Sequence, residues 1–155
     1  MLRIELVTVG RTREAYLAEG IAEYGKRLGR YSQFQFIEVK ERRGVTDPPQ
    51  RLREEGEMLL AACGKGSWKI LLAPEGAMVD SRELASLLSA WETKAAKGIS
   101  FIIGGPDGVG EEVRRAADQC LSLSRMTFTH EMARLILLEQ IYRAFSIRSG
   151  SRYHR

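Results

Sequence analysis

The chain has 155 residues, of which 44% are hydrophobic and 28% charged, and its formal net charge is +4. This composition is typical of a globular protein and argues against long disorder or a membrane protein. The longest apolar run, around Leu135 to Leu138, is far below a membrane span, and the first ten residues read as a strand rather than a signal peptide. We therefore expect one cytoplasmic domain covering residues 1–155.

Metal and disulfide chemistry find little support in the sequence. Cys63 and Cys120 are the only cysteines and form no C-x-x-C pair, and only His130 and His154 could join them. We expect both cysteines to be reduced and structural, and we expect no metal site.

Strand-like and helix-like segments alternate along the first half of the chain. Residues 2–9 and 33–39 are rich in β-forming residues, whereas residues 12–28 carry apolar side chains at helical spacing. The charged, proline-containing stretch 40–49 predicts a mobile loop before a helix that Gly64 ends.

The second half continues the alternation. Residues 68–73 predict a buried strand that runs into a Pro-Glu-Gly turn, after which Asp80 or Ser81 caps a helix. A buried strand from Ile99 leads into the loop Gly104 to Gly110, and a short helix with an acidic first turn follows.

The last part of the chain repeats this order. Residues 121–124 predict a strand, and Thr127 or Thr129 could cap a final apolar helix. The β/α order predicts an α/β fold with a mainly parallel sheet, helices on both faces, and ligands at the carboxyl ends of the strands. Three loops would gather there: residues 73–76, 104–110 and 124–131.

The glycine-rich loop, Gly104 to Gly110, allows a ligand to approach the backbone closely. It matches neither G-x-G-x-x-G nor a Walker loop, because Glu111 stands where the lysine should be. Nucleotide hydrolysis and a Rossmann cofactor both lose support, and the alternative is that these glycines only turn the chain.

The third loop, SRMTFTHE, combines hydroxyls, an arginine, a thioether, an aromatic ring and a histidine. Such a set suits a pocket for a flat, hydrogen-bonding group such as adenine. The alternative makes Met126 and Phe128 core residues, leaves Arg125 solvated, and gives His130 a capping or core role.

The end of the chain is apolar and then basic. Leu135 to Leu138 are consecutive, so a partner subunit could cover part of this helix, although burial within one chain is equally open. Glu139 and Gln140 could form an interface network rather than a catalytic pair. After Glu139 no acid remains, and the cationic and aromatic groups of the tail favour contact with nucleic acid.

Five segments in order resemble one known family. They are LVTVG, APEG, FIIGGPDGVG, LSLSRMTFTHEMARLILLEQIYRAFSI and the terminal YHR. Together they resemble the RlmH family, small SPOUT-superfamily methyltransferases that act on N3 of a pseudouridine in bacterial 23S ribosomal RNA. The resemblance covers essentially the whole chain and implies a trefoil-knotted homodimer that uses S-adenosylmethionine and acts on the assembled 70S ribosome.

The resemblance also implies roles for particular residues. Tyr153 and His154 would close the site over the neighbouring subunit, with His154 as the candidate proton acceptor; the tail could instead be only a lid. The family often has proline where this chain has Thr129. The implied cofactor contacts are Leu72, Gly104, Gly105, Leu123, Ser124, Arg125, Met126, Thr127 and Phe128. The implied RNA contacts are His130, Arg143, Arg148, Arg152 and Arg155.

Two other functions remain open at this point. A SPOUT-type methyltransferase could act on another RNA such as tRNA, because the cofactor loops do not name the substrate. The chain could also be a non-catalytic ribosome-binding factor whose basic tail holds phosphate.

Overall fold

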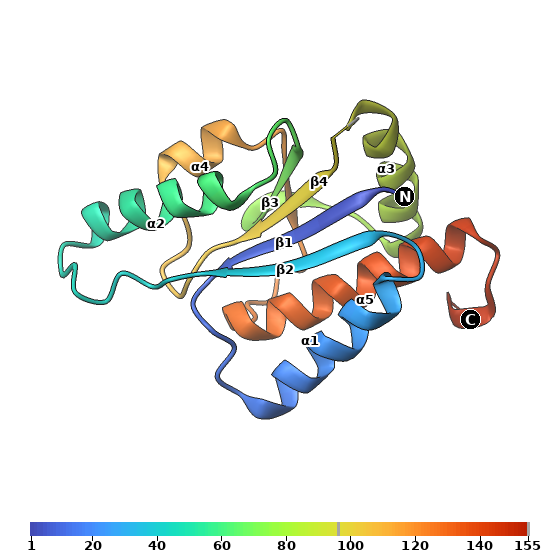
Figure 1. The fold of residues 1–155 in the computed structure, drawn as a ribbon, viewed down its shortest axis with the longest axis horizontal. Helices are drawn as coiled ribbons and strands as arrows, with labels where there is room; N and C mark the ends of the chain where they lie inside the picture. The colour runs from blue at the N-terminus through green and yellow to red at the C-terminus, as the bar shows by residue number, and fades with distance from the viewer. Residues whose placement is uncertain (96, 155) are drawn as a thin grey trace.

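The computed structural model describes residues 1–95 and 97–154, and its helices and strands alternate as the sequence predicts (Figure 1). The strands are β1 (Arg3–Val9), β2 (Gln33–Val39), β3 (Trp68–Met78), β4 (Ile99–Ile103) and β5 (Gln119–Ser122). The helices are α1 (Ala15–Leu28), α2 (Pro48–Ala62), α3 (Ser81–Lys94), α4 (Glu111–Ala116), α5 (His130–Arg148) and the 3-10 turn η1 (Arg152–His154).

The five strands form one sheet in the order β2-β1-β4-β3-β5, and every neighbouring pair is parallel. Side chains alternate between its two faces, as the period of two in a strand requires. In β1, Ile4 and Leu6 pack with α1, α3 and α5, whereas Val7 and Val9 pack with α2 and α4. The predicted α/β fold with helices on both faces is therefore confirmed (Figure 1).

Two helix starts show why the chain folds as it does locally. Asp80 begins α3 with a capping box, in which its side chain and that of Glu83 each accept a backbone N–H. Asp47 caps α2 and accepts the N–H of Gln50, so α2 begins at Pro48, inside the segment predicted to be a loop. Proline fits the first helical turn because the N–H that it lacks would have no helical partner there.

Two strand boundaries differ from the sequence prediction. The Pro-Glu-Gly segment does not end β3, which runs on to Met78 with a register shift between Leu72 and Ala77. Correspondingly, β5 begins at Gln119 and ends at Ser122, two residues earlier than predicted. Both differences arise because β3 and β5 pair again beyond the bulge, a non-local contact that local turn residues do not report.

Within residues 1–95 and 97–154, no helix is both long enough and apolar enough to cross a membrane.

Candidate cofactor site

The sheet register brings the three predicted loops to one end of the sheet, where the strands have their carboxyl ends; we call this the carboxyl edge. Leu71 of β3 pairs with Ile102 of β4, and Leu72 pairs with Leu121 of β5. Gly104 follows β4 by one residue and Leu123 follows β5 by one residue. Gly104 and Leu123 therefore follow the carboxyl ends of β4 and β5, and Leu72 lies within β3 one residue beyond its last pair with β4. All three lie toward the carboxyl ends of the strands, the usual place for ligands in such sheets.

The glycine-rich loop folds back on itself directly after β4. Gly105 and Gly108 form an isolated bridge, and the N–H of Gly108 donates to the carbonyl oxygen of Gly105 at 3.0 Å. A Cβ on Gly104 would lie 2.4 Å from the carbonyl oxygen of Gly108, so no larger residue fits there without moving the loop. Gly104 and Gly105 are buried, whereas Pro106, Asp107 and Gly108 are exposed.

The bulge of β3 forms the second loop. Leu72 and Ala77 are both in register with Leu121, so residues 73–76 are pushed out of the ladder at the edge of the sheet. A Cβ on Gly76 would lie 2.4 Å from the backbone carbon of Leu121. The close passage of β3 over β5 therefore requires glycine at this position.

The third loop leaves two large apolar side chains in solvent. Met126 is 76% exposed and Phe128 is 37% exposed, so the interpretation of both as core residues is wrong. The loop is shaped by short polar contacts: Ser122 Oγ donates to the carbonyl of Ser124, and Ser124 Oγ accepts the N–H of Met126 at 3.0 Å. Leu72 and Leu123 are half-buried beside it. The arrangement offers an apolar wall next to polar backbone.

The first turn of α5 lies at the same edge and organises the β1–α1 connection. Thr129, not Thr127, caps the helix and accepts the N–H of Met132 at 3.1 Å. Glu131 Oε1 accepts the N–H groups of Arg13 and Glu14 at 2.7 and 3.1 Å.

One turn further along α5, Arg134 is fully buried. It donates to the carbonyl oxygen of Val9 at 2.7 Å, to Thr12 Oγ1 at 2.9 Å and to Glu38 at 3.4 Å. Sequence reasoning missed both Glu131 and Arg134, although two charges three residues apart before the apolar run Leu135 to Leu138 were an available signal.

These contacts shift two pKa values at the edge. Burial, and then the charge of Arg134, lower the pKa of His130 below its ordinary value. Burial by itself would raise the pKa of Glu131. Hydrogen bonds from the amides of Glu14 and Arg13, together with nearby positive charge including that of Arg134, lower the pKa overall. At neutral pH this turn therefore holds a neutral imidazole beside a carboxylate.

The tail lies at the opposite end of the sheet. The 19 residues of α5 span about 28 Å, and they run from the carboxyl edge back toward the start of β1, where both termini lie (Figure 1). Tyr153 packs there within its own chain. Its Oη lies 2.8 Å from Tyr24 Oη and 3.2 Å from Glu139 Oε1, and its ring meets that of Tyr142 edge-on at 4.7 Å.

The tail contacts define what Tyr153 and His154 can do chemically. Burial, then the hydrogen bond with Tyr24 and the charge of Glu139, raise the pKa of Tyr153 well above its ordinary value. Tyr153 is therefore a hydrogen-bond donor at neutral pH rather than a base. His154 is half-buried, and its Nδ1 is buried without a hydrogen-bond partner among the described residues.

Three of the predicted RNA-contacting residues, His130, Arg143 and Arg148, are spread along α5. His130 lies at the cofactor edge, whereas Arg143 and Arg148 lie toward the tail and Arg152 is exposed within it. Arg143 pairs with Glu139 and Arg148 with Glu92, both at 2.5 Å. Arg155 falls outside the described residues.

Glu139 and Gln140 form a network within one chain. Glu139 accepts from Arg143, Tyr153 and Gln140, and Ser81 Oγ donates to Gln140 at 2.6 Å. Residues 130–147 are all buried or half-buried in the single chain. The chain itself therefore covers most of α5. This agrees with the interpretation that the helix is buried within one chain rather than by a partner subunit.

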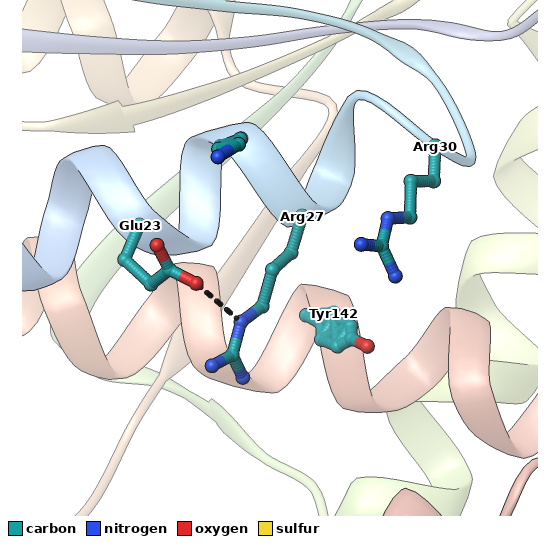
Figure 2. Close-up of a pocket in the computed structure, with 5 residues that line it drawn as sticks. Glu23, Arg27, Arg30 and Tyr142 are labelled. Carbon is teal, nitrogen blue, oxygen red and sulfur yellow. Dashed lines mark hydrogen bonds and ion pairs between the residues drawn. The ribbon is translucent and has the colours of Figure 1, made fainter.

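A basic hollow of about 310 Å³ lies beside the tail rather than at the three loops. Figure 2 shows Arg27 of α1 and Arg30, in the turn after α1, projecting around it, with Tyr142 of α5 across from them. Glu23 accepts a hydrogen bond from Arg27 at 3.0 Å, so part of the positive charge is neutralised locally.

The two cysteines are free thiols in the single chain. Cys63 is buried and Cys120 half-buried, and burial raises the pKa of each. In the part of the chain that the structure describes, no three His, Cys, Asp or Glu side chains gather as metal ligands.

The fold and the edge define an α/β protein with a loop-built ligand site at the carboxyl ends of a parallel sheet. The profile of the family described as "Predicted SPOUT methyltransferase" matches residues 2–154. The chain therefore belongs to the SPOUT methyltransferases, and its curated relatives place it in the RlmH family within them.

Three relatives illustrate that membership, and each is named "Ribosomal RNA large subunit methyltransferase H". The relative from Streptococcus thermophilus is 40% identical, and the match covers 99% of this chain and all of the relative. Those from Heliobacterium modesticaldum and an Anaeromyxobacter species are both 42% identical, over 100% and 99% of this chain and all of each relative.

Two solved structures share the fold. A probable methylase family protein from Haemophilus influenzae has a TM-score of 0.56 at 14% identity, with coverage of 99% of this chain and 70% of that one. A tRNA methyltransferase from Aquifex aeolicus has a TM-score of 0.56 at 20% identity, with coverage of 92% and 69%. At these identities the likeness concerns the fold alone.

Proposed function

We propose that this protein transfers a methyl group from S-adenosylmethionine to N3 of a pseudouridine in 23S ribosomal RNA, within the assembled 70S ribosome. The observation that carries the proposal is the register that brings Leu72, Gly104 and Leu123 to one edge of the sheet in a SPOUT-family chain. The names of the full-length relatives support large-subunit ribosomal RNA as the substrate. The enzyme acts as one methyltransferase domain, residues 1–155, in the cytoplasm.

The residues at the edge suit S-adenosylmethionine. Exposed Met126 and Phe128, with half-buried Leu72, provide apolar surface for the adenine ring and for the carbon chain of the ligand's methionine part. The compact turn at Gly104 and Gly105 lets backbone groups approach the ligand without side chains between them. Ser124, Arg125 and Thr127 supply polar groups around the same loop.

The chemistry requires alignment and removal of one proton. When bound, S-adenosylmethionine supplies an electrophilic methyl group on its sulfonium. The chain has to hold the base in line with that methyl group and help N3 lose its proton. We assign the proton acceptor to His154, whose Nδ1 makes no hydrogen bond in the described chain, and the donor that orients the uracil ring to Tyr153.

A second copy of the chain has to bring these two residues to the loops. The tail and the three loops lie at opposite ends of the sheet in one chain, separated by the length of α5. We therefore propose a homodimer in which the tail of one subunit completes the site of the other. The trefoil knot that the family resemblance implies belongs to the same proposal.

RNA contacts are assigned to the basic residues that flank this composite site. His130 lies beside the cofactor loops, whereas Arg143 and Arg148 lie toward the tail and Arg152 lies within it. Arg155, which falls outside the described residues, is assigned to the same group by its position in the sequence. Arginines in this position bind phosphate and fix the orientation of the RNA without reading its sequence.

The test is methyl transfer from labelled S-adenosylmethionine to 70S ribosomes that lack the modification, followed by nucleoside mass spectrometry. We expect 3-methylpseudouridine in 23S ribosomal RNA and little transfer to a short free hairpin. Methyl transfer only to tRNA would show that the proposed substrate is wrong and that the protein is a methyltransferase of another RNA. Ribosome binding without any binding of S-adenosylmethionine would overturn the enzymatic proposal and favour a non-catalytic ribosome-binding factor.

A further inference from the structure

Two ion pairs join the helices of one face to two of the three cofactor loops. Arg51 of α2 donates to Asp107 of the glycine-rich loop at 2.5 Å. Arg114 of α4 pairs with Glu75 in the bulge of β3. Neither arginine belongs to the loops, and each reaches across from the helical layer to an exposed carboxylate.

The two helices are a firm base for these contacts. Val113 of α4 is fully buried, and a Cβ on Gly56 of α2 would lie 3.0 Å from its Cγ2, so the two helices are in close contact at this point. Leu52 of α2 lies against the end of the glycine-rich loop, within 3.8 Å of the Cβ position of Gly110. Arg51 is therefore anchored on an element that already touches the loop.

We propose that Arg51 and Arg114 are positioning residues for cofactor binding, because they fix the glycine-rich loop and the β3 bulge in the arrangement that receives the ligand. The inference rests on the proposed use of S-adenosylmethionine. Neither arginine needs to touch the ligand; each acts through the carboxylate that it holds.

The exposure of the pairs separates this role from a purely structural one. Asp107 and Glu75 are 60% and 52% exposed as side chains, and pairs of this kind add little to the free energy of unfolding. Without these pairs the loops are less ordered in the free protein. The ligand must then order them when it binds, which makes the free energy of binding less favourable. Binding should weaken although the fold is retained.

The experiment measures the Kd of S-adenosylmethionine by calorimetry, and KM and kcat with 70S ribosomes, for matched variants. Arg51→Ala is expected to raise the Kd and the KM for the cofactor about fivefold, about 1 kcal/mol, with kcat at saturating cofactor unchanged. Arg114→Ala is expected to act in the same direction. Arg53→Ala, an exposed arginine on the same helix, is the control and should leave all three values unchanged.

A charge exchange decides whether the pair itself is responsible. Arg51→Asp should weaken binding, and the double variant with Asp107→Arg should recover most of it. Wild-type protein that fails to bind S-adenosylmethionine overturns the proposed function. Wild-type binding with an unchanged Kd in Arg51→Ala, or an exchange that restores thermal stability without restoring the Kd, overturns the positioning role alone.

Discussion

Arg134 shows how one buried charge can set the geometry of a site that it does not enter. Its guanidinium is removed from water, a cost that lowers its pKa, and is compensated by Val9, Thr12 and Glu38. These partners come from the end of β1, the β1–α1 connection and β2. Because Arg134 lies one turn after the cofactor loop, it ties the start of α5 to the carboxyl ends of β1 and β2.

Replacing this side chain should therefore destabilise the whole protein. We expect Arg134→Leu to lower the free energy of unfolding by about 2–4 kcal/mol, because buried acceptors lose their donors. Arg148→Leu, which removes an exposed pair with Glu92, should cost at most about 1 kcal/mol. Urea unfolding of the two variants makes the comparison, and equal losses would contradict this account of Arg134.

His130 should make stability depend on pH. Its pKa in the folded protein lies below 6.5, so the unfolded chain binds the proton more strongly, and stability falls as pH drops from above about 6.5 through the folded pKa. Replacement by glutamine removes this component. Urea unfolding at about pH 7.5 and about pH 5.5 should show a smaller loss in His130→Gln than in wild type. An equal loss in both proteins would mean that another group is responsible.

At the scale of elements, the start of α5 is fixed by a side chain where the family often has proline. Thr129 has φ of −61°, within the range that proline imposes, and its hydroxyl caps the helix. The backbone angle is therefore fixed at this position without proline. Threonine adopts the same backbone angle and adds a hydrogen bond that proline cannot make.

The cap gives a direct comparison between two neighbouring threonines. Thr129→Ala should cost about 1 kcal/mol of unfolding free energy, because the N–H of Met132 loses its acceptor. Thr127→Ala removes an exposed hydroxyl that does not cap the helix and should change stability by less than about 0.5 kcal/mol. Thermal or urea unfolding separates the two; a larger loss in the Thr127 variant would contradict the observed cap.

Elements with strong local signals could be predicted from the sequence, and those that depend on distant partners could not. The capping box at Asp80 and the buried run from Ile99 to Ile103 each carry their own cue. In β3, by contrast, Pro74 and Gly76 are local signals for a turn, yet the strand continues through them. It continues because its last residues pair with Leu121 and Ser122, far along the chain. Arg51 and Asp107 are likewise 56 residues apart, and no local pattern links them.

At the scale of the whole molecule, the division between loops and tail is the main consequence of the fold. The cofactor loops lie at the carboxyl ends of the strands because the sheet is parallel, and α5 then carries the chain back to the other end. The sequence indicated both halves of the site. Only the topology shows that one chain holds them apart, which is why we propose a dimer.

Complementation between two inactive variants tests that claim most directly. Gly104→Ala should disable the cofactor loop, because its Cβ meets Gly108, and keep the tail; a chain ending at Ser151 should keep the loop and lose the tail. Each variant alone should be inactive on 70S ribosomes. Co-expressed with different tags, they should form mixed dimers with one intact site each, and equal mixing should restore about a quarter of wild-type methyl transfer. Purified mixed dimers that remain as inactive as either parent would contradict a site shared between two subunits.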